Sequence, residues 1–547
     1  MTGNEIIKRF DGMNDYAEGN WKNIWQECAD WAMPTNDNVN NIKIAGQEKS
    51  PQRMIDTCIE ANFNFASGFF SHMFPPNTIW AKFRHPMPSM MSKQPVADYF
   101  EEVSRIIHGV MTGSNFAQEE FQALLAMGCF GTSCMSVEES DKNVVTFRNF
   151  IISKVRIAEN YQGIVDTVAR EFQLDPRQAI QQFGEEALKK ADLEKIIVDA
   201  ENVKKTKYEF VHYVCPRSDY DTKKKDKLNK PYASFYVSRD GMQIVKEGGF
   251  DYLPYKVARF VVGNDEVYGR SPMSMKLGAA RRANTIYRSV VVSAEQHTNP
   301  QWLVPDDDSV KGLSSRANAV IRWRSTNPNG RPERLPVNGD PGIGKDLLDM
   351  HDAEIKRMFF NHLFRPLEDY RNMTAFEVNE RMTSDLMILA PFVSRYTDEK
   401  VTPTMEQVYY LCAKSGILPP IPAELAEHPD FEIDYVGRLS LATKNFEVLG
   451  AVNTLRVFGE LGQMAPQLAG AVDNVDPDKL FKEMWYSNSS SMNALKDEKQ
   501  VDAEREARAA QQQEQQQIEN LAPMADAAQK LSGATDPTSL IEKARGN

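Results

Sequence analysis

At 547 residues the chain exceeds what one hydrophobic core usually organises, so two to four structural units are expected. Apolar residues make up 41% of the sequence, which is enough for a buried core and too many for a disordered chain. The net charge of −12 argues against tight, non-specific DNA binding, because such affinity comes from basic residues that displace counterions from phosphates. The chain therefore either makes no contact with nucleic acid or contacts it without binding it tightly.

The sequence has no segment typical of a membrane span or a secretory leader. The longest apolar candidate, residues 386–393, is far shorter than the roughly 18 residues that a span needs. Residues 1–10 mix charged and polar side chains with few apolar ones. We therefore expect no membrane partner, and assembly in a cytoplasm.

The cysteines predict no metal site. Six are spread between Cys28 and Cys412, and no two of them form a CxxC pair. Zinc sites of the ribbon type need thiolates paired at two-residue gaps. We expect reduced thiols that serve as small core residues.

The first third of the chain reads as helices joined by polar loops. Hydrophobic periodicity indicates helical segments over 5–31, 53–73, 96–112 and 116–127. Either Ser114 or Asn115 is the expected N-cap of the last segment.

The middle of the chain is rich in strand-forming residues. Residues 208–214 and 232–238 are aromatic and β-branched, which favours strands. The pair Asp240-Gly241 predicts a turn into a further strand over 242–247.

Two amphipathic helices are then expected to bracket a small module. The first covers 271–297 and begins at Ser271-Pro272, with proline at the first helical position. The second covers 345–362. Between them, residues 298–342 are rich in proline and glycine and contain short strand candidates such as 318–324, which predicts a small β or α/β module.

A long, interrupted helix is expected next. Thr374 and Glu377 form a capping box, and helical periodicity continues toward Lys414 through Pro391 and Pro403. Each proline disfavours a straight helix, so we expect kinks or breaks. The last hundred residues are rich in alanine and glutamine and are expected to contain an exposed helix with little core, and the end beyond about Pro523 is expected to be disordered.

One segment approaches a nucleotide-binding motif. Residues 339–346 fit the phosphate-loop pattern GxxxxGK[ST] in every place but the last, where Asp346 replaces the hydroxyl that ligates magnesium. Pro336 also weakens the strand that should precede such a loop. We expect a glycine-rich turn that leads into the helix at residue 345, and a DNA-packaging ATPase stays as an alternative.

Metal chemistry finds little support. His351-Asp352 resembles half of a metal phosphohydrolase pair, and residues 306–308 are three aspartates. Neither has a partner at ligand spacing, so a histidine on a helix face and a polar turn are expected. We predict no catalytic residue, no metal and no cofactor, and hence a protein that is not an enzyme.

Several motifs, taken in order, resemble a known family. They are Ala66-Ser67-Gly68-Phe69-Phe70-Ser71, Pro75-Pro76 with Trp80, Tyr268-Gly269-Arg270-Ser271-Pro272, Thr374-Ala375-Phe376-Glu377-Val378 with Glu380-Arg381, and Gly416-Ile417-Leu418-Pro419-Pro420. This set is similar to the head-to-tail connecting (portal) proteins of short-tailed bacteriophages. The resemblance spans about residues 20–445.

The resemblance implies a mainly α fold with α+β parts, organised as a phage portal. The expected parts are a wing over 1–267, a first stem helix over 268–297, a clip over 298–342, a second stem helix over 343–363, a tunnel loop over 364–373, a long kinked wing helix and its return over 374–440, a crown over 441–522 and a flexible tail over 523–547.

The resemblance also implies a function. Twelve copies would form a ring at one capsid vertex of the virion, and would conduct double-stranded DNA during packaging and ejection. The expected partners are the terminase large subunit, the major capsid protein, a scaffold protein and tail adaptor or nozzle proteins. A capsid-interior scaffold or adaptor is a further alternative.

Basic and polar residues are the candidates for contact with DNA and partners. The DNA-channel candidates are Arg365, Arg371, Asn372, Lys345 and Lys356. The candidates for docking of terminase or tail proteins on the clip are Arg316, Arg322, Arg324, Arg331 and Arg334.

Overall fold

The computed structural model describes residues 1–40, 53–304, 341–364, 387–437 and 501–511 apart from gaps of one to four residues, together with 310–311, 322–323 and 333–334. The chain divides into two compact units, Met1–Val457 and Phe458–Asn547. In the second unit, residues 503–508 are helical. All other elements belong to the first unit, where helices and sheets occur together, as expected.

The amino-terminal third is helical, which confirms the prediction. Its elements are α1 (Gly3–Gly19), α2 (Trp21–Ala32), the 3-10 helix η1 (Pro34–Asn36), α3 (Thr57–Met73), α4 (Pro88–Met91), α5 (Gln94–Gly113) and α6 (Phe116–Phe130). The first predicted segment therefore consists of two helices instead of one.

Both candidate caps of α6 are used, each in a different way. The Oγ of Ser114 accepts a hydrogen bond from the backbone N–H of Phe116 at 3.2 Å. Asn115 occupies the N-cap position, but its side chain bonds the backbone N–H and C=O of Phe147 at 2.9 and 2.7 Å. Asn115 thus ties the start of α6 to a neighbouring strand.

Two antiparallel sheets follow. The larger has the order β4-β5-β6-β7-β8, and the smaller the order β3-β2-β9. Their strands are β2 (Thr132–Ser140), β3 (Val144–Phe150), β4 (Val155–Glu159), β5 (Val165–Leu174), β6 (Tyr208–Pro216), β7 (Tyr232–Ser238), β8 (Ile244–Phe250) and β9 (Tyr255–Arg259). The predicted strands at 208–214 and 232–238 are confirmed, and they pair with each other, with His212 opposite Tyr236.

The turn between β7 and β8 differs in detail from the expectation. The residue with a left-handed backbone is Met242, at φ 49°, and not the glycine that precedes it. The backbone N–H of Ser238 bonds the carbonyl of Gln243 at 3.0 Å, which closes the turn.

The two faces of the five-stranded sheet carry different layers. Along β6, alternate residues point to opposite faces. Val211 packs with Ile6 and Phe10 of α1, whereas Phe210 packs with residues of three short helices, including Leu188. These helices are α7 (Pro176–Phe183), α8 (Glu185–Lys190) and α9 (Glu194–Glu201). The sheet is therefore covered on both faces.

The largest core joins the helices to the smaller sheet. Its fully buried aromatic residues include Trp25, Phe65, Phe100 and Phe147. All six cysteines are buried and free, which confirms their prediction as small core residues. Burial raises the pKa of the Cys412 thiol to about 11, so this thiol stays protonated near neutral pH.

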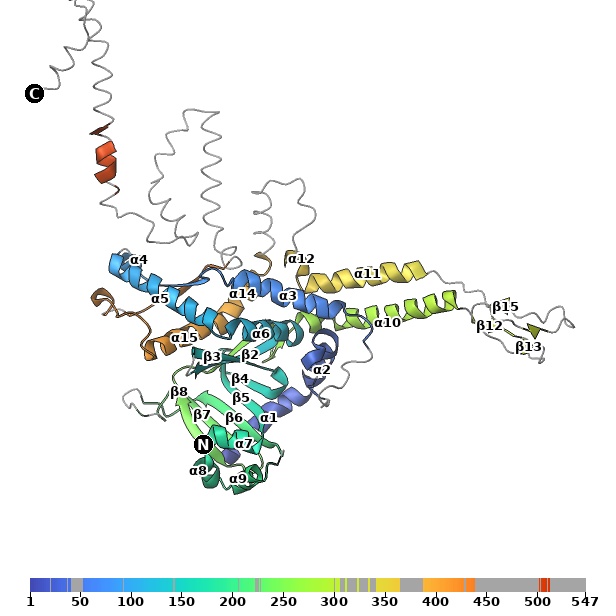
Figure 1. Cartoon of the computed structure of the whole chain (residues 1–547), viewed down its shortest axis with the longest axis horizontal. Helices are drawn as coiled ribbons and strands as arrows, with labels where there is room; N and C mark the ends of the chain where they lie inside the picture. The colour runs from blue at the N-terminus through green and yellow to red at the C-terminus, as the bar shows by residue number, and fades with distance from the viewer. Residues whose placement is uncertain are drawn as a thin grey trace, which may run out of the picture. The chain divides into compact units, whose positions relative to one another are not determined.

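Two long helices lie side by side, with short strands at their far end (Figure 1). The helices are α10 (Pro272–Thr298) and α11 (Pro341–Met358). The strands form two antiparallel pairs, β12 (Trp302–Leu303) with β15 (Glu333–Arg334), and β13 (Val310–Lys311) with β14 (Arg322–Trp323). This confirms the prediction of two amphipathic helices that bracket a module with short strands. We call α10, α11 and these strands the helical hairpin.

The bounds of the second helix differ from the expectation. It begins at Pro341, so the glycine-rich segment expected to be a turn forms the first helical turn. Proline suits this place because the first helical N–H has no partner within the helix. The helix ends at Met358, since Phe360 has a left-handed φ of 57°, and α12 (Asn361–Phe364) follows.

The last helices contain the two prolines that were expected to disturb them. Pro391 lies in the first turn of α14 (Ala390–Tyr396), and Pro403 in the first turn of α15 (Thr402–Lys414). A π-helical turn, η4 (Thr397–Val401), joins the two helices. The expected kink or break between these helices is therefore a π-helical turn, which is wider than an α-helical one. The strand β16 (Glu432–Tyr435) then pairs with β1 (Ala81–Arg84).

Three sequence predictions concern residues that the structure does not describe. The capping box at Thr374 and Glu377, the aspartates at 306–308 and residues 365–373 of the tunnel loop predicted over 364–373 lie outside the described residues, while Phe364 is the last residue of α12.

Candidate functional site

The first helix of the hairpin starts at a buried reciprocal cap. The Oγ of Ser271 accepts a hydrogen bond from the backbone N–H of Ser274 at 2.8 Å, and the Oγ of Ser274 accepts one from the N–H of Ser271 at 2.9 Å. The next residue is Pro272, at the first helical position. Together these residues explain why α10 begins at the predicted place.

The chain crosses itself closely just before this helix. Gly269 lies in β11 (Gly269–Arg270), which pairs with β10 (Val261–Val262). A Cβ atom on Gly269 would overlap the carbonyl oxygen of Gly131, and one on Gly131 would overlap that of Gly269. The backbone N–H of Gly269 also donates a hydrogen bond to the Oγ1 of Thr132 at 2.8 Å. Only glycine permits this approach, which fixes the start of α10 to the end of α6. We call residues 268–272, where α10 begins, the root of the hairpin.

An aromatic cluster holds the same root to the amino-terminal helices. The ring of Tyr268 is fully buried, with its centroid 5.0 Å from that of Trp25 and 5.6 Å from that of Trp21. The guanidinium of Arg270 lies over the Trp21 ring at 4.9 Å. The Tyr268–Pro272 motif therefore supplies an anchor, a close crossing and a helix start in consecutive residues.

The second helix is anchored at its carboxyl-terminal half. Ile355 and Phe359 are fully buried in the main core. Asp352 accepts a hydrogen bond from Thr57 of α3 at 2.8 Å, and Lys356 lies 3.3 Å from Glu60 of the same helix. Lys356, a DNA-channel candidate, is thus half-buried and paired within its own chain.

The two helices of the hairpin also bind each other. Lys276 of α10 pairs with Glu354 of α11 at 2.5 Å, and this pairing lowers the pKa of the Glu354 carboxyl. Near the other end, a Cβ on Gly344 would overlap the side chain of Val290. Lys276 therefore pairs within the chain, and so does Arg281 of α10, with Glu27 of α2.

The half of the hairpin away from the root exposes apolar side chains. Tyr287, Val292, Leu347 and Met350 are between 36% and 55% exposed. Contact with another molecule would remove these apolar side chains from water.

The candidate contact residues are placed as follows. Lys345 is exposed on the first turn of α11. Arg334 is exposed in β15, and its guanidinium lies 5.2 Å from the ring centroid of Trp302. Arg322 lies in β14. The others lie outside the described residues: Arg316, Arg324, Arg331, Arg365, Arg371 and Asn372.

The nucleotide-binding alternative loses its structural basis. Residues 341–345 are helical, so they do not form the loop that a GxxxxGK phosphate site needs before its helix. His351 lies 3.4 Å from Glu354, and Asp352 accepts from Thr57. Among the described residues, no group of three histidine, cysteine, aspartate or glutamate side chains could hold a metal ion.

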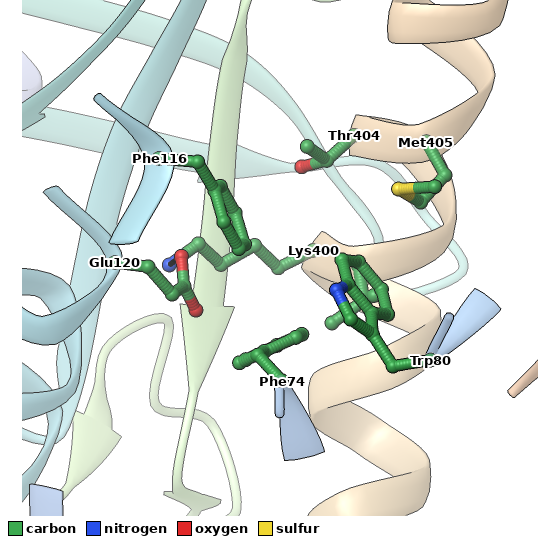
Figure 2. Close-up of a pocket in the computed structure, with 8 residues that line it drawn as sticks. Phe74, Trp80, Phe116, Glu120, Lys400, Thr404 and Met405 are labelled. Carbon is green, nitrogen blue, oxygen red and sulfur yellow. Dashed lines mark ion pairs between the residues drawn. The ribbon is translucent and has the colours of Figure 1, made fainter. Parts of the chain in front are cut away.

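A buried ion pair that no sequence pattern predicted lies at the π-helical turn between α14 and α15. Glu120 of α6 and Lys400 of η4 lie 2.8 Å apart, and each side chain is only 1% exposed. The hydroxyl of Tyr396 donates to the same carboxylate, and the Lys400 ammonium donates to that hydroxyl at 3.1 Å. Figure 2 shows the Lys400 side chain reaching to the Glu120 carboxylate, and both residues line a small cavity.

A second ion pair, which is only partly buried, links the same π-helical turn to β9. Glu399 lies 2.7 Å from the guanidinium of Arg259 in β9, and also accepts the backbone N–H of Arg259 at 2.9 Å. Arg259 further pairs with Glu159 and donates to the carbonyl of Gly163 at 3.0 Å. Two adjacent residues, Glu399 and Lys400, thus tie one turn to α6 and to β9. Nothing in the sequence around either residue distinguishes it from a surface charge.

None of the helices in the described part of the chain is both long and apolar enough to cross a bilayer. The features above define a mixed α and β protein whose distinctive element is a helical hairpin anchored in the main core.

The chain belongs to the family described as bacteriophage head to tail connecting protein, whose sequence model matches residues 3–494. It is 27% identical over 533 residues to the portal protein of Salmonella phage epsilon15, covering 94% of this chain and 93% of that protein. It is 26% identical over 544 residues to the probable portal protein of Bordetella phage BPP-1, covering 97% and 95%. This confirms the family indicated by the sequence motifs.

Proposed function

We propose that this chain is a portal subunit that forms a ring at one capsid vertex and conducts double-stranded DNA, without catalysing a reaction. The family match over residues 3–494 carries this proposal. The similarity to the two phage proteins, over 94% and 97% of the chain, supports it.

Assembly into a ring would cover the exposed apolar side chains of the hairpin. Apolar surface removed from water contributes about 25 cal/mol per Å². A closed ring repeats one head-to-tail contact between neighbouring copies. The copy number of twelve follows the family resemblance.

We assign the proposed parts to the described elements in the following way. The stem would be α10 and α11, with its second helix over 341–358 and not 343–363. The clip would be the strands at the far end of the hairpin, and the wing would contain the helices and sheets before residue 268. The crown over 441–522 and the tail over 523–547 remain proposals from the sequence.

The acidic charge suits a conduit. Each copy carries a net charge of −12, and repulsion of the phosphate backbone would let DNA slide instead of adhering. This field acts only over about 8 Å at physiological salt, so it matters for DNA inside a narrow tunnel.

The energy for packaging would come from a separate ATPase, the terminase large subunit. We place its docking site, shared in turn with tail adaptor or nozzle proteins, on the clip at Arg316, Arg322, Arg324, Arg331 and Arg334. The major capsid protein and a scaffold protein would bind the ring during assembly in the host cytoplasm, before it becomes part of the virion.

The tunnel loop at 364–373 is the proposed constriction, with transient phosphate contacts from Arg365, Arg371 and Asn372. Shortening residues 367–371 should leave ring assembly intact but impair packaging or retention of DNA. Electron microscopy of the rings and measurement of the DNA held in particles test this.

The double variant Arg84→Ala/Arg105→Ala is a matched control, because it removes two exposed arginines that only make surface ion pairs. It should package normally. Normal packaging and retention of full-length genomes by the shortened loop would show that the loop is not the constriction.

A further inference from the structure

One face of α3 contacts the chain both before and after the proposed tunnel loop. The residues of this face are Phe65, Gly68, Phe69 and His72, which lie three and four positions apart and therefore line up along the helix. Two of them, Gly68 and Phe69, belong to the motif over 66–71 that helped to indicate the family. Figure 1 shows α12, the last helix before the loop, beside α3.

The chain before the loop is seated on Gly68. A Cβ atom on Gly68 would overlap both the Cγ and the Cβ of Phe364, the last residue of α12. These atoms lie next to the Phe364 backbone, so a rotation of the ring alone could not make room for a side chain at position 68. One turn further along α3, the His72 ring has its centroid 5.5 Å from that of Phe364. The contact between α3 and α12 therefore requires glycine at position 68.

The chain after the loop is seated on the neighbouring residue. The ring centroid of Phe69 lies 5.0 Å from that of Phe392 and 5.4 Å from that of Tyr396, and both of these residues belong to α14. Phe65 contacts both sides, with its centroid 6.5 Å from that of Phe359 and 6.2 Å from that of Phe392. Phe65 and Phe69 are fully buried in the main core, where close packing resists displacement.

We propose that this face of α3 positions the tunnel loop, with Gly68 as the positioning residue for its first member, Phe364. The proposal rests on the proposed function of the loop as the constriction. Because the contacts on both sides of the loop are made by one buried helix, the core would fix where the loop begins and where the chain returns from it. A load that DNA places on the loop would then be carried by the main core.

Gly68→Ala in the full-length protein tests the seat of Phe364. Rings should still assemble, and a density map of them should show Phe364 displaced from α3 while Phe392 keeps its contact with Phe69. Particles that carry the variant should retain fewer full-length genomes than wild-type particles. A map in which Phe364 keeps its wild-type position would overturn the proposal.

Two other glycine variants are the controls. Gly109→Ala adds a Cβ to α5 that meets nothing within 4 Å, so assembly and retention should match those of the wild type. Gly3→Ala places a Cβ against the carbonyl oxygen of Met242, at the turn between β7 and β8, so it should lower the Tm without lowering retention. An equal loss of genomes in Gly3→Ala and Gly68→Ala would show a general effect of stability and would overturn the positioning role.

Phe364→Leu keeps the test decisive if Gly68→Ala does not assemble. Leucine removes the aromatic contact with His72 but introduces no overlap with Gly68, so rings should form and retention should fall by less than in Gly68→Ala. Where both variants assemble, the loss in the double variant should be smaller than the sum of the single losses, because both changes affect one contact. Additive losses would contradict a shared contact.

The shortened loop, which lacks residues 367–371, separates this proposal from the proposed function. Normal retention by the shortened loop would reject the loop as the constriction, whatever the Gly68 variant does. Impaired retention by the shortened loop, together with normal retention by Gly68→Ala and Phe364→Leu, would leave the loop as the constriction and overturn its positioning by α3.

Discussion

Glu120 and Lys400 are each 1% exposed and lie 2.8 Å apart, so each charge is stable in the core only because of the other. Lys400→Met would leave the carboxylate buried without its partner. Breaking a buried pair in this way costs about 3–5 kcal/mol, so we expect the free energy of unfolding to fall by that amount. Denaturant titration of the full chain measures it.

A surface pair in the same region gives the control. Lys414 and Glu139 lie 2.6 Å apart but are 52% and 58% exposed, so Lys414→Met should cost no more than about 1 kcal/mol. The double variant Glu120→Leu/Lys400→Met should be more stable than Lys400→Met alone. Equal losses for Lys400→Met and Lys414→Met would contradict the assigned role of the buried pair.

Lys256 of β9 gives a prediction for pH dependence. Burial lowers the pKa of this ammonium to about 7, although Glu406 of α15 opposes the shift. The unfolded chain therefore binds more protons than the folded chain between pH 7 and the ordinary lysine pKa. Over this range the contribution of Lys256 to stability rises with pH, by at most about 1.4 kcal/mol per pH unit.

Lys256→Met removes this titration. The variant should be more stable than the wild type at pH 7, and the advantage should shrink toward pH 10. The measurement is the difference in unfolding free energy between the two proteins over this pH range. A difference that does not change with pH would contradict the assignment.

At the residue scale, the sequence could not predict these buried charges. Lys256, Glu120 and Lys400 stand in segments where a lysine or glutamate usually faces solvent. Their burial depends on contacts between residues up to about 280 positions apart, as for Glu120 with Lys400. The cysteines were predicted correctly, because their spacing excluded metal sites and left burial as the ordinary use of a thiol.

At the scale of elements, the packing of α10 against α11 depends on a glycine. Alanine normally stabilises a helix interior relative to glycine by about 0.5–1 kcal/mol. At Gly344, however, the added Cβ would overlap Val290, so Gly344→Ala should destabilise the hairpin. The measurement is the Tm of the variant against that of the wild type.

Gly278 of α10 is the control, because its nearest neighbour would be the end of the Arg282 side chain at 3.5 Å. Gly278→Ala should therefore raise the Tm slightly. Adding Val290→Ala to Gly344→Ala should recover part of the loss by making room for the Cβ. A stabilising effect of Gly344→Ala alone would show that the helices do not approach closely there.

The bounds of elements were predictable where a local signal sets them. Ser271-Pro272 marked the start of α10 correctly, since both the cap and the proline act within one turn. The start of α11 was misread because Gly342 and Gly344 resemble a turn, whereas one of them serves helix packing. The end of α11 at a left-handed Phe360 carries no sequence signal, since a bulky residue rarely adopts that conformation.

At the scale of the whole molecule, the order of weak motifs predicted the family that the match over 3–494 confirms. The sequence could predict the family because some short segments are constrained by their own local contacts, independently of the rest of the chain. Tyr268–Pro272 is an example, since it combines an aromatic anchor, a close glycine contact and a helix cap. It could not show how the charges of the hairpin are distributed. Lys276 and Arg281 pair within the chain, so fewer charges of α10 remain for contacts between copies.

Electron microscopy of the purified full-length protein at micromolar concentration and moderate salt tests the central proposal most directly. A portal subunit should form rings with a central opening, and the exposed side chains Tyr287, Val292, Leu347 and Met350 should become buried between copies. Particles that are uniformly monomeric under these conditions would contradict it.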